Sequence, residues 1–159
     1  SKASYRSRAG RKEKEVAMAI EKILVAVDGS EGADRALEMA QAVAAPSPDT
    51  HIDLVYVVPI PLLDDNQAAN FKSILDMMVA DGRELLIEAR DKMPEVADRT
   101  DTLIITGTNP ATEIIKLIEK GGYDLMVIGS RGLSGIKAYL GSVSHKVLNG
   151  SKVSVLIAK

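Results

Sequence analysis

The chain has 159 residues, of which 46% are hydrophobic and 26% are charged, enough for one globular domain with its own core. A formal net charge of −2 argues against nucleic acid or an anionic membrane as a partner. The lack of cysteine excludes disulfides and thiolate metal sites, and two histidines far apart in sequence argue against a histidine-based zinc site. No apolar run approaches the roughly 20 residues that span a bilayer, and no signal-peptide pattern is visible, so we expect a cytoplasmic protein without metal ligands.

Residues 1–20 differ from the rest of the chain, because they are basic and lack apolar periodicity. Lysine and arginine outnumber acidic side chains there, and the acidic ones are Glu13 and Glu15 alone. We predict a poorly ordered N-terminal extension, which either binds an acidic partner or is simply solvated. The folded domain is predicted to cover residues 21–159.

The first half of that domain alternates short apolar runs with helical patterns. Ser30 is a candidate N-cap, and prolines close several of these segments. The predicted elements are a strand over 22–27, a helix after Ser30 that ends before Pro46, a strand over 52–58 and an amphipathic helix over about 66–93.

The second half repeats the alternation. The predicted elements are a strand over 102–106, a helix over 110–120 ended by Gly121-Gly122, a strand over 125–128, a helix after Gly141 and a strand over 153–158. Strands that alternate with helices predict an α/β fold with a parallel sheet and right-handed crossovers. Nothing in the sequence marks a second domain.

Polar segments follow two of the predicted strands. Asp28 comes after the first strand, and Gly129-Ser-Arg-Gly132 comes after the fourth, with Gly141-Ser142 at the start of the next helix. Ligands of open α/β sheets bind beyond the carboxyl ends of strands, where the strand order reverses. Glycines allow close backbone approach, and a helix start offers free N–H groups to an anion. If the first and fourth strands are neighbours, these segments predict a nucleotide site.

Each candidate residue has an expected role. Asp28 suits ribose hydroxyls, Gly129 and Gly132 allow phosphate to come close, and the backbone of Val57 suits an adenine edge. Arg131 adds charge, the hydroxyls of Ser142 and Ser144 are donors, and the N–H groups of 142–144, Val143 included, face the anion. Alternatives stay open: Asp28 or Ser142 caps a helix without a ligand, and Arg131 and Lys137 are solvated loop charges.

Three segments together resemble the universal stress protein family over about residues 20–159. They are Ile23-Leu-Val-Ala-Val-Asp28-Gly-Ser30, Tyr123-Asp124-Leu-Met-Val-Ile-Gly129-Ser-Arg-Gly132-Leu-Ser-Gly, and Leu140-Gly141-Ser142-Val-Ser144 leading to Val153-Ser-Val-Leu-Ile157. The resemblance implies a five-stranded parallel sheet in the order 3-2-1-4-5 with helices on both faces, a Rossmann-like fold of the adenine nucleotide alpha hydrolase type. It also implies binding of ATP, with Mg²⁺ or Mn²⁺ held through the phosphates, and a homodimer.

Pairing of the C-terminal strand, 153–158, with its copy would cover an apolar sheet edge in that homodimer. The sequence departs from the family pattern at three places. Residues 133–140 separate Gly132 from Gly141, eight residues where the family has nine. Ser154 stands where the family often has proline, and the basic extension lies outside the pattern. The shorter spacing bears on triphosphate geometry and not on the fold.

Signals for catalysis are weak. The chain has no Walker Gly-x4-Gly-Lys-Ser/Thr pattern and no Gly-x-Ser-x-Gly nucleophile elbow. Ser142 and His145 are three residues apart, which would place a nucleophile and a base on one face of a helix. A histidine that is simply exposed on the helix is the simpler interpretation. Three hypotheses remain: an ATP-binding regulatory module of a stress response, a slow ATPase or self-phosphorylating protein, and a dimeric stress scaffold that binds no nucleotide.

Overall fold

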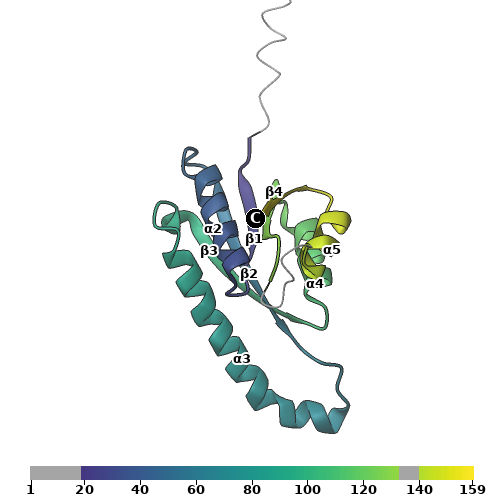
Figure 1. The fold of residues 1–159 in the computed structure, drawn as a ribbon. Coiled ribbons are helices and arrows are strands. Elements are labelled where there is room, and N and C mark those ends of the chain that lie inside the picture. The colour runs from purple at the N-terminus through teal and green to yellow at the C-terminus, as the bar shows by residue number, and fades with distance from the viewer. Residues whose placement is uncertain (1–18, 133–139) are drawn as a thin grey trace, which may run out of the picture.

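A computed structural model describes residues 19–132 and 140–159 (Figure 1). The basic extension up to residue 18 and most of the short glycine spacing, 133–139, lie outside the described residues. The five strands pair in parallel in the order β3-β2-β1-β4-β5, which confirms the predicted sheet. Their bounds are β1 Lys22–Ala26, β2 His51–Pro59, β3 Thr100–Gly107, β4 Leu125–Gly129 and β5 Ser154–Ala158.

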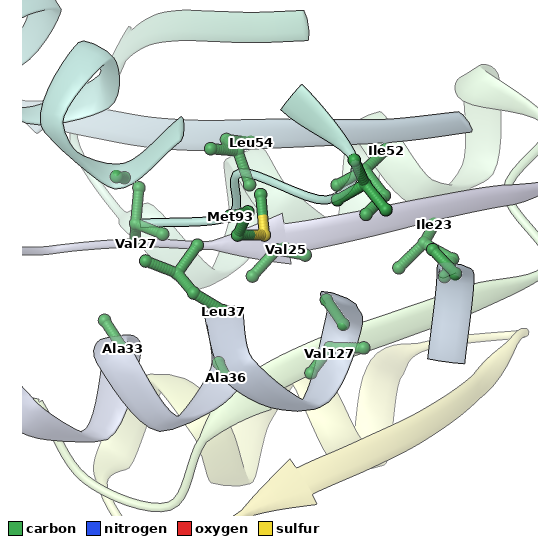
Figure 2. Packing of buried hydrophobic residues seen from close by; sticks show 14 of the residues in the cluster. Ile23, Val25, Val27, Ala33, Ala36, Leu37, Ile52, Leu54, Met93 and Val127 are labelled. Atoms are coloured by element: carbon green, nitrogen blue, oxygen red, sulfur yellow. The ribbon is translucent and has the colours of Figure 1, made fainter. Parts of the chain in front are cut away.

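Helices cover both faces of the sheet, so the central strands are apolar on both sides. Ile23 and Val25 of β1 contact the layer formed by α2 (Glu31–Ala44) and α3 (Asp65–Asp91). Leu24 between them faces the other layer, α4 (Pro110–Gly121) and α5 (Ser142–Gly150). Figure 2 shows the first layer, with Ala33, Ala36 and Leu37 directed at the strands. This two-sided burial explains why the strands read as continuous apolar runs instead of alternating ones.

The helices begin and end where the sequence provides capping residues. The Ser30 side chain accepts the N–H of Ala33 at the start of the first helix, and Asp64 and Gln67 form a capping box. Gly122, at φ 67°, ends the next helix in the left-handed conformation. The helices are α2 Glu31–Ala44, α3 Asp65–Asp91, α4 Pro110–Gly121 and α5 Ser142–Gly150, with a 3₁₀ turn, η1 Ala97–Arg99.

Only the C-terminal part of α3 packs against the sheet. Its buried residues are Gly82, Leu86 and Ala89, whereas Ile74 and Met77 are exposed. Figure 1 shows the N-terminal part of this helix extending beyond the edge of the sheet. No helix in the described part of the chain is both long and apolar enough to cross a bilayer.

A polar network occupies the sheet edge at which the strands begin. The buried phenol of Tyr123 donates to Asp53 Oδ2 at 2.6 Å, and His51 Nε2 lies 3.0 Å from Asp101 Oδ2. Burial, then the hydrogen bond and charge of Asp53, raise the pKa of Tyr123 well above its ordinary value, so the phenol stays protonated and donates. β2 and β3 start at His51 and Thr100, one and two residues earlier than the apolar pattern predicts.

Candidate functional site

The carboxyl ends of β1 and β4 lie side by side, because Ile23 to Val25 pair with Leu125 to Val127. A cavity of about 670 Å³ opens beyond these two ends, which is in the usual range for small-molecule sites. All nine site residues predicted from the sequence line it: Asp28, Val57, Gly129, Arg131, Gly132, Gly141, Ser142, Val143 and Ser144. The predicted convergence of two strand ends is therefore present in the fold.

Asp28 has two different surroundings for its two carboxylate oxygens. Oδ1 accepts the N–H of Ser30 at 2.9 Å, which holds the turn into α2. Oδ2 faces Gly132, where an added Cβ would lie 2.7 Å away. No residue of the described chain donates a hydrogen bond to Oδ2. The capping role left open by the sequence is thus filled by one oxygen, and the other remains free to accept from a ligand.

The segment after β4 is fixed to the sheet by its own amides. Ser130 N–H donates to the Ala158 carbonyl and Gly141 N–H donates to the Ser130 carbonyl, both at 2.7 Å. These two N–H groups are therefore not available to an anion. The bonds instead set the start of α5 beside the end of β4.

The first turn of α5 supplies the free donors. Its N-cap is Gly141, which no side chain of residues 19–132 or 140–159 caps, so the alternative of Ser142 as the N-cap is wrong. The first amide paired within the helix is that of His145, which donates to Gly141 O at 2.9 Å. The N–H groups of 142–144 precede it and have no partner among the described residues. Together with the helix dipole they favour an anion.

Two predicted ligand contacts have a structural role instead. The Ser144 hydroxyl is buried and donates to the Gly129 carbonyl at 2.6 Å, so its hydrogen already serves the fold. Gly129 has no room for a side chain because an added Cβ would lie 2.5 Å from the backbone C and O of Gly32. The missing side chain of Gly129 allows α2 to approach β4. From the sequence alone, we expected this glycine to let a phosphate come close.

Val57 offers its backbone to the cavity. Val27 N–H donates to the Val55 carbonyl at 2.9 Å, so the polar groups of Val55 face β1. Backbone polar groups alternate sides along a strand, so the N–H and carbonyl of Val57 also face that side. Since the β1 pairing stops at Val55, they lie beyond its last partner. An adjacent donor and acceptor of this kind suit the edge of a heterocyclic base.

Apolar residues that sequence reasoning missed form the rest of the wall. They come from the ends of β2 and β4 and the start of α4, and include Pro59, Ile128, Pro110 and Ile114. Ser30, at the entrance to α2, lines the cavity too. The strand order is the one feature that could have revealed the residues from α4. Because α4 follows β3 in a parallel sheet, its N-terminus lies at the same end of the sheet as the carboxyl ends of β1 and β4.

The remaining polar candidates divide. Arg131 is half-buried and lines the cavity, as expected for a residue that adds charge to an anion site. His145 is exposed, with Nε2 3.1 Å from Asn149 Nδ2, and is not among the lining residues. The cavity therefore joins a carboxylate oxygen, helix-start amides, one guanidinium and an apolar slot. Such a set complements a molecule with hydroxyls, an anionic group and a flat ring.

Comparison with known proteins gives one family. The model of the Universal stress protein family matches residues 19–159. Universal stress protein YxiE of Bacillus subtilis is 31% identical over 147 residues, which cover 87% of this chain and 98% of that protein.

Solved structures agree on the fold. Universal stress protein UspA from Lactobacillus plantarum has a TM-score of 0.78 at 22% identity, with 89% of this chain and all of that chain covered. A universal stress protein in complex with cAMP has a TM-score of 0.67 at 26% identity, with 89% of this chain and 98% of that chain covered. Both therefore share the architecture over nearly their whole length.

Proposed function

As the chain belongs to the universal stress protein family, we propose that it binds an adenine nucleotide, ATP, in the cavity at the ends of β1 and β4. The observation that carries the proposal is the meeting of three groups around one cavity: Asp28 Oδ2, the first-turn amides of α5 and the backbone of Val57, none of which has a hydrogen-bond partner among the described residues. The related structure in complex with cAMP supports the adenine class.

The three groups divide the nucleotide among them. Asp28 Oδ2 accepts from the ribose hydroxyls, and Val57 pairs with the adenine edge against the apolar wall of Pro59 and Ile114. The amides of 142–144 receive a phosphate, and Arg131 extends the positive field toward further phosphates. Mg²⁺ or Mn²⁺ is held through the phosphates, because Asp28 is the only carboxylate among the lining residues of the described chain.

We propose a regulatory role in the stress response and not efficient catalysis. Among the described lining residues no histidine or second carboxylate is present to activate a water, and Asp28 is directed at Ser30 and Gly132. Nucleotide occupancy favours the arrangement in which α5 and the ends of β1 and β4 enclose the phosphates. A partner that contacts this edge of the sheet would then distinguish the bound from the free state.

Mass spectrometry of the denatured purified protein, together with calorimetric titration of ATP, AMP and GTP, tests the proposed ligand. We expect adenine nucleotides to bind and GTP to bind more weakly, because the Val57 backbone fits one base edge. Asp28→Asn keeps an oxygen for the Ser30 amide but removes the charge, and should weaken ATP about fivefold, the equivalent of about 1 kcal/mol. Full ATP affinity in this variant would remove the ribose contact from the proposal.

We further propose that β5 pairs with its copy in a homodimer. This strand is at the edge of the sheet, and Val155, Leu156 and Ile157 are half-buried there. The Ala158 carbonyl accepts from Ser130 on the β4 side, so by alternation the backbone of Val155 faces outward. An outward row of donors and acceptors on an apolar strand favours pairing with a second copy.

Val155→Pro is designed to disrupt that pairing alone. It removes an outward N–H while the ladder with β4 keeps its bonds. Light scattering at micromolar concentration should show a dimer for the unaltered chain and a monomer for Val155→Pro, with similar thermal melting. A monomeric unaltered chain, or a dimeric variant, would contradict pairing through β5.

A further inference from the structure

A second cluster of ionisable side chains lies where the strands begin, at the opposite end of the sheet from the cavity at their carboxyl ends. His51 and Asp53 are two residues apart on β2, so their side chains share one face, and Asp101 of β3 is paired with Asp53 in register. The potential ligand atoms of these three residues all lie within 4.8 Å of one another. From His51 to Val57 the strand covers about 20 Å, so the cluster is separate from the nucleotide cavity.

The carboxylates converge on a single histidine nitrogen. His51 Nε2 lies 3.0 Å from Asp101 Oδ2 and 3.3 Å from Asp53 Oδ1. Asp53 Oδ1 thus faces the imidazole, whereas Asp53 Oδ2 accepts the hydrogen of the Tyr123 phenol. Asp53 is only 8% exposed, so a largely buried carboxylate is directed at the cluster.

No lysine or arginine of the described chain forms an ion pair with either carboxylate. Lys22 lies over the Tyr123 ring at 4.6 Å and donates to the Gly121 carbonyl at 2.7 Å. A divalent cation would neutralise the two carboxylates that converge on the His51 imidazole. Buried charge without such compensation is costly.

We propose that His51, Asp53 and Asp101 form a binding site for a divalent transition-metal cation of the zinc type. With bonds of about 2.0–2.1 Å, tetrahedral ligands lie about 3.3 Å apart, and the observed separations of 3.0 and 3.3 Å are close to this. An imidazole among the ligands favours zinc, nickel or copper over magnesium and calcium, which take oxygen alone. His51 and Asp101 are partly exposed, so water completes the coordination.

Tyr123 orients the site from behind. Its phenol donates to Asp53 Oδ2 at 2.6 Å and leaves Oδ1 directed toward His51. Hydrogen bonds of this kind fix the orientation of metal-binding carboxylates, and their loss commonly weakens the metal tenfold or more. Tyr123 is therefore a positioning residue, since its own oxygen is engaged with Asp53. The sequence argument against zinc counted histidines, but a mixed site of this kind requires only one.

The experiment is a calorimetric titration of the intact, chelator-treated chain with ZnCl₂ in the absence of nucleotide. We expect one zinc per chain with micromolar affinity, and no heat from MgCl₂ at the same concentration. His51→Gln and Asp101→Asn should abolish zinc binding. The chain has two histidines, so His145→Gln is a matched control and should bind zinc as the unaltered chain does. Tyr123→Phe should bind about tenfold more weakly.

Two further readings make the result decisive. Cobalt substitution should give the visible absorption of a nitrogen and oxygen site in the unaltered chain and not in His51→Gln. ATP affinity should be the same in His51→Gln as in the unaltered chain, because the two sites lie at opposite ends of the sheet. The proposal is overturned if the unaltered chain binds no zinc, or if His145→Gln abolishes binding while His51→Gln retains it.

Discussion

Gly129→Ala is expected to destabilise the fold by about 3 kcal/mol and to disrupt the cavity with it. An added Cβ would lie 2.5 Å from both the carbonyl carbon and oxygen of Gly32, and these are backbone atoms that cannot rotate away. The first turn of α2 is fixed in turn by the Ser30 cap. To relieve the overlap α2 must move away from β4, which exposes core residues such as Ala36 and Leu37.

Gly141→Ala provides the matched control for this substitution. Gly141 has φ −58°, which any residue adopts, and the nearest atom to an added Cβ is Arg131 Cα at 3.4 Å. We expect its unfolding free energy to stay within about 0.5 kcal/mol of the unaltered chain in urea denaturation. If Gly129→Ala were equally stable, close packing of α2 on β4 would not be the reason for a glycine at this position.

The contrast between these glycines shows a limit of sequence reasoning. Both belong to the same motif, and the motif predicts a ligand near each of them. Whether a missing Cβ serves a ligand or a packed helix depends on which backbone faces it. For Gly129 that backbone is Gly32, almost a hundred positions earlier in the chain, and no local pattern reveals the contact. Gly129 lines the cavity, and its missing Cβ makes room for the backbone of Gly32.

The alternation of strands and helices was predictable, because apolar runs are local features. The strand order, and with it the convergence of Asp28 with the segment after β4, came from the resemblance to the family. The register in which the strands pair could not be predicted from the sequence. Val57 becomes a donor and acceptor for the cavity only because β1 pairing stops at Val55. Likewise, His51 and Asp101 come within 3.0 Å only because β3 pairs with β2 in one particular register. Such contacts between distant residues follow from tertiary structure and leave no periodic signal.

Ser142→Pro is expected to lower ATP affinity by about 10- to 100-fold while the fold remains intact. Ser142 is the first residue of α5, where proline is well tolerated because the helix does not use that N–H. Gly141 has ψ 151°, which suits a residue that precedes proline. The substitution thus deletes one amide directed at the phosphate, together with the Ser142 hydroxyl. A hydrogen bond to a charged group contributes about 1.5–3 kcal/mol, which sets the expected loss.

Ser142→Ala separates the amide from the hydroxyl, since it keeps the N–H and removes only the side-chain oxygen. Ser142 is exposed, so this variant should bind ATP within about threefold of the unaltered chain, the effect of less than 1 kcal/mol. Calorimetric titration of both variants, with thermal melting to confirm folding, makes the comparison. Equal affinities for ATP would mean that the first amide of α5 does not contact the phosphates. If both variants lose affinity to the same extent, the contact belongs to the hydroxyl, which both substitutions remove, as the sequence motif first suggested.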